Sequence, residues 1–152
     1  NKSYPYLSVH ETKRAQLNFF QPKHMTNVAF KDKLLSLAES VDTNSGGVSN
    51  DPTLLNIELD LIRKSMAMET ATQDHFDLGQ KRTKEKYLAM MLVMHTEINK
   101  FGELQKELKM DYAKGVRGAF PTTVADTLDL LNHFKPSISK FRKKRETDCF
   151  CY

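Results

Sequence analysis

Residues 83–108 read TKEKYLAMMLVMHTEINKFGELQKEL, and this stretch decides the expected fold. Its apolar residues recur at spacings of three and four, as they do on one face of an α-helix. It contains no proline, and its one glycine costs only about 1 kcal/mol relative to alanine. A continuous helix of this length would be roughly 39 Å long. We therefore predict one long central helix whose apolar face the rest of the chain covers. The expected face consists of Tyr87, Met91, Met94, Ile98, Phe101, Leu104 and Leu108.

Shorter helical patterns flank this stretch. A first helix is expected to begin near Asn27, with Thr26 or Asn27 as its N-cap, because either side chain can accept a hydrogen bond from the first turn. The turn-rich sequence DTNSGGVSND follows at residues 42–51 and predicts an exposed loop. The expected core residues of the first helix are Phe30, Leu34, Leu37 and Val41.

A second helix is expected at Asp51-Pro52, which is typical of an N-cap followed by proline at the first helical position. Its pattern weakens across residues 69–77, before the long stretch begins. Towards the end of the chain, Thr122 or Thr123 is expected to cap a last helix that Pro136 ends. The apolar positions are Leu54, Leu55, Ile57, Leu61, Ile62, Met66 and Met68 in the second helix, and Val124, Leu128, Leu131 and Phe134 in the last.

The sequence has no internal repeat and no pair of strand-like segments. We therefore predict an all-α fold, a single-domain helical bundle of about five helices around one long central helix. Residues 1–23 lack a helical period, contain Pro5 and Pro22 and are rich in apolar residues, which predicts an extended N-terminal arm packed along the bundle. Residues 24–138 are the expected bundle, and residues 139–152 a basic C-terminal tail. No apolar run is long enough to span a membrane.

Positive charge is concentrated at the two ends of the chain. Residues 1–23 carry a net charge of +3 and residues 135–152 one of +4, whereas the whole chain carries +4, so the body between them is slightly acidic. Such ends favour an anionic partner, and the alternative is a solvated tail that keeps the protein soluble. The candidate residues for binding a membrane or another anionic partner are Lys140, Phe141, Arg142, Lys143, Lys144 and Arg145.

The motifs of catalysis and metal binding are absent from the sequence. No two of the five histidines are four residues apart, and neither HExxH nor a GxSxG nucleophile elbow occurs. His95 lies beside the expected core and is interpreted as a structural histidine. The basic tail is not accompanied by a helix-turn-helix, zinc-finger or RNA-recognition motif. We expect a protein that is not an enzyme and has no cofactor, no metal and no nucleic-acid partner.

Five short motifs follow one another along the chain: Phe20-Gln21-Pro22-Lys23, Asn27-Val28-Ala29-Phe30, Ile98-Asn99-Lys100, Asp111-Tyr112-Ala113-Lys114 and Asp129-Leu130-Leu131. In order and approximate spacing, the chain resembles the gastropod sperm acrosomal protein family, which includes abalone sperm lysin and its fusogenic paralogue. The resemblance extends from about residue 19 to residue 136. The loop at residues 42–52 looks inserted, and the chain has no tryptophan where lysins use it.

The resemblance implies a secreted, non-enzymatic protein of the sperm acrosomal vesicle, built as a helical bundle and acting in fertilization at the egg surface. Lysins dissolve the egg vitelline envelope by stoichiometric binding to its glycoprotein, and the paralogue is thought to promote sperm–egg membrane fusion. The mild net charge of this chain favours the fusogenic role, with lysin-type dissolution as the alternative. The expected partner is the egg plasma membrane or the egg-envelope glycoprotein, and a homodimer is possible.

A helical cytokine similar to interferon-gamma is a further alternative. A helical core without cysteine, the start of the second helix at residues 48–54 and the basic tail after the last helix favour it. Two features disfavour the cytokine alternative: too few helices follow the long helix, and the first 26 residues precede the first helix. An intracellular adaptor or nucleic-acid binder rests on the basic tail alone.

Overall fold

The structure is a computed structural model that describes residues 4–66, 73–116 and 118–135. All regular secondary structure in these residues is helical, which confirms the predicted all-α fold. The elements are α1 (Pro5–Leu17), α2 (Asn27–Ser45), the 3-10 helix η1 (Val48–Asn50), α3 (Pro52–Met66), α4 (Gln73–Met94), α5 (Ile98–Ala113) and α6 (Val124–His133).

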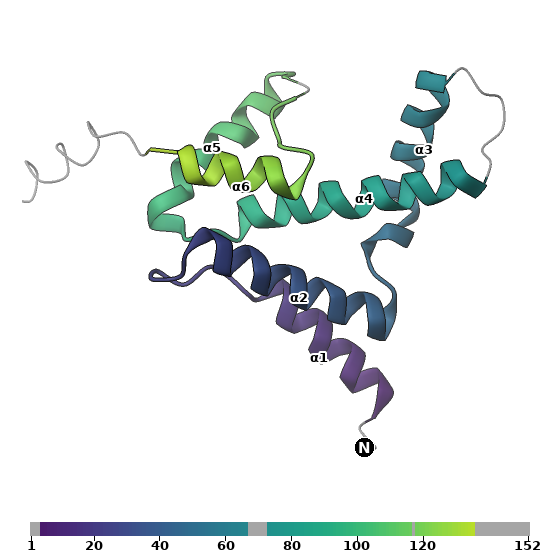
Figure 1. Cartoon of the computed structure of the whole chain (residues 1–152), viewed down its shortest axis with the longest axis horizontal. Helices are drawn as coiled ribbons and strands as arrows, with labels where there is room; N and C mark the ends of the chain where they lie inside the picture. Colours follow the sequence, from purple (N-terminus) through teal and green to yellow (C-terminus); the bar gives the residue numbers. More distant parts are fainter. Residues whose placement is uncertain (1–3, 67–72, 117, 136–152) are drawn as a thin grey trace, which may run out of the picture.

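Helix α4 crosses the centre of the molecule, and the other helices lie on different sides of it (Figure 1). Helix α2 runs along one side of α4, and α1 packs against α2. On the other side in this view, α6 lies over the C-terminal half of α4 and α3 packs against its N-terminal half. The arrangement is a helical bundle built around α4.

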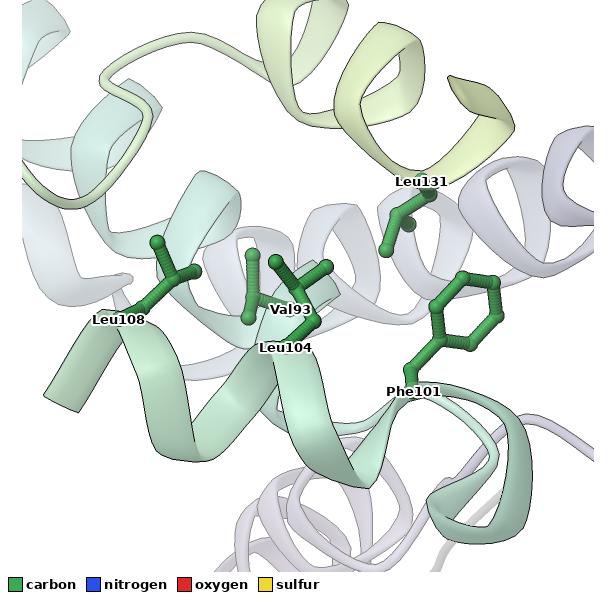
Figure 2. Packing of buried hydrophobic residues seen from close by; sticks show 5 residues of the cluster. All are labelled: Val93, Phe101, Leu104, Leu108 and Leu131. Atoms are coloured by element: carbon green, nitrogen blue, oxygen red, sulfur yellow. The ribbon is translucent and has the colours of Figure 1, made fainter. Parts of the chain in front are cut away.

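Two groups of buried apolar side chains meet at the C-terminal end of α4. One group consists of Phe30, Leu34, Met91 and Leu92. The other consists of Val93, Phe101, Leu104, Leu108 and Leu131. Figure 2 shows the three α5 side chains of the second group pointing towards α6, with Leu131 pointing back between them. Because Leu92 and Val93 are adjacent in sequence but belong to different groups, this end of α4 is buried on more than one side, as expected of a central helix.

The prediction of one continuous helix over residues 83–108 is wrong. The chain leaves α4 after Met94 and begins α5 at Ile98. Glu97 is the N-cap of α5, because its carboxylate accepts hydrogen bonds from the backbone N–H groups of Asn99 and Lys100 at 3.1 and 2.8 Å. Ile98, expected in the core, is 70% exposed, since the break rotates α5 relative to α4.

A side chain of the connecting segment and one of α5 stabilise this break. The hydroxyl of Thr96 donates a hydrogen bond to the carbonyl oxygen of Val93 at 2.6 Å. The side-chain amide of Gln105 donates to the same carbonyl oxygen at 3.1 Å and to the Thr96 hydroxyl oxygen at 3.0 Å. These bonds satisfy backbone groups that a continuous helix would have paired internally, so the corner has its own hydrogen-bonding network.

The prediction of an extended N-terminal arm is also wrong, because residues 5–17 form α1. Proline favours the first position of a helix, where its missing N–H needs no partner, and Pro5 occupies that position. The residues of α1 have only a weak amphipathic pattern and none of them is buried, which is why no helical period is visible in the sequence. The arm does pack along the bundle, against α2.

The predicted helix starts are confirmed at three N-caps. Thr26 accepts a hydrogen bond from Ala29 N at 3.1 Å, and Thr123 accepts one from Asp126 N at 3.1 Å. Asp51 accepts bonds from the backbone of the first turn of α3 at 3.0 and 3.2 Å, directly before proline. Helix α2 continues to Ser45, so the irregular loop is shorter than the expected 42–51 segment.

Candidate binding surfaces

The residues predicted to bind a membrane or an anionic partner lie outside the described residues, and so does the whole predicted tail at 139–152. The binding role of the tail therefore stays a prediction. The six residues concerned are Lys140, Phe141, Arg142, Lys143, Lys144 and Arg145.

A polar junction brings together several residues of the motifs that carry the family resemblance. Gln21 is buried, and its amide donates hydrogen bonds to the carbonyl oxygen of Met25 and to Asn27 Oδ1, both at 3.0 Å. Gln21 Oε1 accepts a hydrogen bond from Glu97 N at 3.2 Å, next to the start of α5. Asn27 in turn donates to Asn132 Oδ1 on α6 at 2.9 Å. These motif residues hold helices together.

His95 belongs to the same junction. Its Nδ1 lies 2.7 Å from the carbonyl oxygen of Phe19, which can only accept, so Nδ1 carries the hydrogen. Its ring stacks on Phe20 with 4.4 Å between centroids, and its carbonyl oxygen accepts a hydrogen bond from Gln21 N at 2.8 Å. The geometry agrees with the interpretation of His95 as a structural histidine.

A groove of about 740 Å³ has α3 on one side. The end of α5 and the residues that follow α5 form the other side. We call it the α3–α5 groove. Ile57 and Leu61 of α3 form one wall, and Tyr112 and Val116 form the other. Figure 1 shows these two parts of the chain on the same side of α4. All four side chains are roughly half exposed, from 46% for Leu61 to 64% for Tyr112. Ile57 and Leu61 belong to the apolar positions predicted for the second helix, and they line this surface.

Glu58 and Lys86 also line this groove. The Glu58 side chain is only 5% exposed, and its Oε1 lies 2.6 Å from Lys86 Nζ. Its Oε2 is buried and accepts no hydrogen bond from the described residues. The burial of Glu58 was not predicted, although Glu58 is three residues from buried Leu55 and four from buried Ile62, a spacing that places it on the same helical face.

A second hollow of about 380 Å³ lies between the C-terminal end of α1, α2 and α4. Three of its polar lining residues have partners: Lys84 forms an ion pair with Asp42, and Asn50 Oδ1 accepts a hydrogen bond at 2.6 Å from Gln80, which lies outside the hollow.

The start of α1 presents exposed aromatic side chains. Tyr4 and Tyr6 are 65% and 77% exposed, and their ring centroids are 5.4 Å apart. Leu7 extends this apolar surface, and the basic residues Lys13 and Arg14 lie further along the same helix, also exposed. Aromatic and basic residues on one exposed helix suit the interface between water and a membrane.

Neither a metal site nor a membrane span is found in the described part of the chain. No three of its His, Cys, Asp and Glu side chains are grouped so that they could hold a metal ion. None of its helices is both long enough and apolar enough to cross a bilayer.

Comparison with known proteins found no matching family model, no matching curated protein and no matching solved structure.

Proposed function

We propose that this chain is a secreted, non-enzymatic sperm acrosomal protein that acts in fertilization at the egg surface, where it promotes fusion of the sperm and egg membranes. The observation that carries the proposal is the ordered series of motifs resembling the gastropod acrosomal family. The position of Gln21 and Asn27 in the polar junction supports it, since residues that hold helices together are those that related bundles would share.

The two ends of the chain supply the physical basis for membrane binding. Each lysine or arginine of the 140–145 segment gains about 1 kcal/mol near an anionic leaflet. Phe141 would enter the interface between head groups and acyl chains, where aromatic side chains are favoured. The exposed start of α1, with Tyr4 and Tyr6, provides a second apolar contact. Two separate contacts would allow one molecule to bridge two membranes.

The first experiment measures lipid mixing and content mixing in vesicles that contain anionic phospholipid. The intact chain is expected to bind and fuse these vesicles, and binding should weaken as salt rises, because salt screens exposed charges. A variant with K140Q, R142Q, K143Q, K144Q and R145Q is expected to lose binding. The control is K81Q/R82Q, which removes two exposed cations from α4 and should leave binding unchanged. Equal binding by the tail variant would contradict the proposed role of the tail.

Dissolution of isolated gastropod egg envelopes, measured in parallel, tests the lysin-type alternative. The α3–α5 groove favours this alternative, since a half-exposed apolar surface suits stoichiometric binding to a glycoprotein. Envelope loss without vesicle fusion would establish the alternative and overturn the fusogenic role. If neither activity is found, the helical cytokine becomes the leading hypothesis, and binding to a receptor ectodomain without lipid affinity is its test.

A further inference from the structure

Three helix ends meet around the polar junction. Helix α2 begins at Asn27, α5 begins directly after Glu97, and α6 ends one residue after Asn132. Hydrogen bonds join Asn27 to Asn132, and they join Gln21 to both Asn27 and Glu97. Figure 1 shows the three helix ends on the same side of the molecule, at the left of the view. We call this region the junction end, which consists of residues 19–28, 95–100 and 130–135.

The junction end exposes three large apolar side chains. Phe20 is 54% exposed, Val28 is 49% exposed and Ile98 is 70% exposed. Each of them directly precedes or follows a hydrogen-bonded residue of the junction, and consecutive Cα atoms are only about 3.8 Å apart. The three side chains therefore surround one junction, although they come from three segments of the chain. A group of exposed apolar residues, unlike a single scattered one, indicates an interaction site.

The charge of the junction end favours an anionic partner. Its residues include three lysines and one acidic residue, Glu97. The Glu97 carboxylate already accepts hydrogen bonds from two backbone N–H groups at the start of α5. Exposed lysines beside exposed apolar side chains suit a membrane that contains anionic lipids, because head groups attract the cations and the apolar side chains leave water. The three lysines, all exposed, are Lys23, Lys100 and Lys135.

The basic segment 140–145 is attached to this same end. Lys135 follows α6 directly after Phe134 and is the last described residue. Five residues of extended chain span at most about 18 Å, so Lys140 lies within that distance of Lys135. The cations of the tail and the lysines of the junction end can therefore contact one anionic surface together.

We propose that the junction end is the face of the folded body that lies on an anionic phospholipid membrane. Phe20, Val28 and Ile98 enter the interface between head groups and acyl chains, and the lysines contact the head groups. The inference rests on the proposed membrane activity and adds the surface of the body that makes the contact. Figure 1 shows the start of α1 away from this end, so the second proposed contact stays free for a second membrane.

The first test measures co-sedimentation of the intact chain with phosphatidylcholine vesicles that contain about 30% phosphatidylserine. Val28→Ser with Ile98→Ser should weaken binding about ten-fold or more, because two apolar side chains no longer leave water. The matched control is Ile57→Ser with Leu61→Ser, two similarly exposed residues of α3, and it should bind like the original chain. All four side chains are exposed, so both variants should fold.

A charge variant tests the lysines of the junction end. Lys23→Gln with Lys135→Gln should weaken binding to the same vesicles about ten-fold or more. The matched control is Lys81→Gln with Arg82→Gln, which removes two exposed cations from α4. Equal binding of the intact chain to vesicles of phosphatidylcholine alone would overturn the anionic partner.

A fluorescent label reports the orientation of the body on the membrane without removing an apolar contact surface elsewhere. Ile98→Cys is made in a chain that also carries Cys149→Ser and Cys151→Ser, and the new thiol is labelled with an environment-sensitive dye. Addition of the anionic vesicles should move the emission to shorter wavelength, because the dye leaves water. The same label at Ile57→Cys should keep its emission in water.

Equal binding by the original chain and the Val28 and Ile98 variant would overturn the inference, and so would an emission shift at position 57 without one at position 98. In either case binding of the intact chain would leave the proposed function standing. Binding that depends on the junction end but causes no lipid mixing would support the inference and overturn the fusogenic role. Failure of the intact chain to bind anionic vesicles would overturn both.

Discussion

At the scale of single residues, Gln21 makes more long-range contacts than its sequence pattern indicates. It is buried, and its side chain bonds to Met25 and Asn27 on one side and to Glu97 on the other. Replacing it by alanine should lower the free energy of unfolding by about 1–3 kcal/mol, because buried backbone groups lose their partners. Urea unfolding followed by circular dichroism measures this change.

Gln73→Ala is the control for that substitution. Gln73 is exposed, and among the described residues its side chain bonds to the exposed side chain of Asp77, so the loss should be about 0.5 kcal/mol or less. Equal losses for Gln21→Ala and Gln73→Ala would show that the polar junction does not contribute to stability.

Two glycines that share a helical conformation should respond in opposite ways to larger side chains. A Cβ at Gly102 would lie 3.5 Å from Ile98 Cγ1, an ordinary contact, so Gly102→Ala should raise the free energy of unfolding by about 0.5–1 kcal/mol. A Cβ at Gly79 would lie 3.1 Å from Leu59 Cδ2 and 3.2 Å from Leu55 Cδ1, where α3 and α4 meet. Gly79→Leu should lower the free energy of unfolding by about 1 kcal/mol or more, because the interface between α3 and α4 would be overpacked.

The shift in urea midpoint at constant slope measures both glycine variants. A gain in stability from Gly79→Leu would mean that α3 moves away from α4 easily, and would weaken the description of this interface as closely packed.

At the scale of elements, the corner between α4 and α5 depends on Glu97. Glu97→Ala removes the carboxylate that accepts from Asn99 N and Lys100 N, and should cost about 0.5–2 kcal/mol of stability. Glu97→Asp should stay within about 0.5 kcal/mol of the original chain, because aspartate is also a good N-cap. Thermal or urea unfolding distinguishes the two variants. Similar losses in both would show that Glu97 acts through something other than capping.

Local sequence patterns predicted three helix starts correctly. Thr26, Asp51 and Thr123 begin helices as predicted, because an N-cap involves residues at most three positions apart. The α4–α5 break was not predicted, because the apolar spacing continues across it and the polar partners of the corner, Gln21 and Gln105, come from outside residues 95–97. Helix α1 was not predicted because none of its residues is buried.

At the scale of the whole molecule, α4 joins the two buried groups through adjacent residues, Leu92 and Val93. The bundle should therefore unfold in one cooperative transition. Phe30→Ala and Phe101→Ala, one in each group, should each lower the free energy of unfolding by about 3–5 kcal/mol, since both side chains are fully buried. The two variants should shift the same transition.

Circular dichroism and tyrosine fluorescence test this in parallel, because the chain has no tryptophan. Coincident curves from the two probes are expected for each variant. Separate transitions in Phe101→Ala alone would show that α5 and α6 unfold independently of α2. Ile98→Ala is the exposed control and should change stability by about 0.5 kcal/mol or less.

The sequence by itself determined the helical class, three helix starts and much of the core, because apolar periodicity and N-capping are local properties. Only the tertiary structure decided where the long apolar stretch breaks and which apolar residues remain on the surface. Ile57 and Leu61 fit the helical pattern of α3 as well as the buried Leu55 and Ile62 do. Whether such a residue is covered depends on which helices lie opposite, and the same packing buries Glu58 beside Lys86 at the α3–α5 groove. Burial is a property of the assembled bundle, so periodicity within one helix cannot specify it.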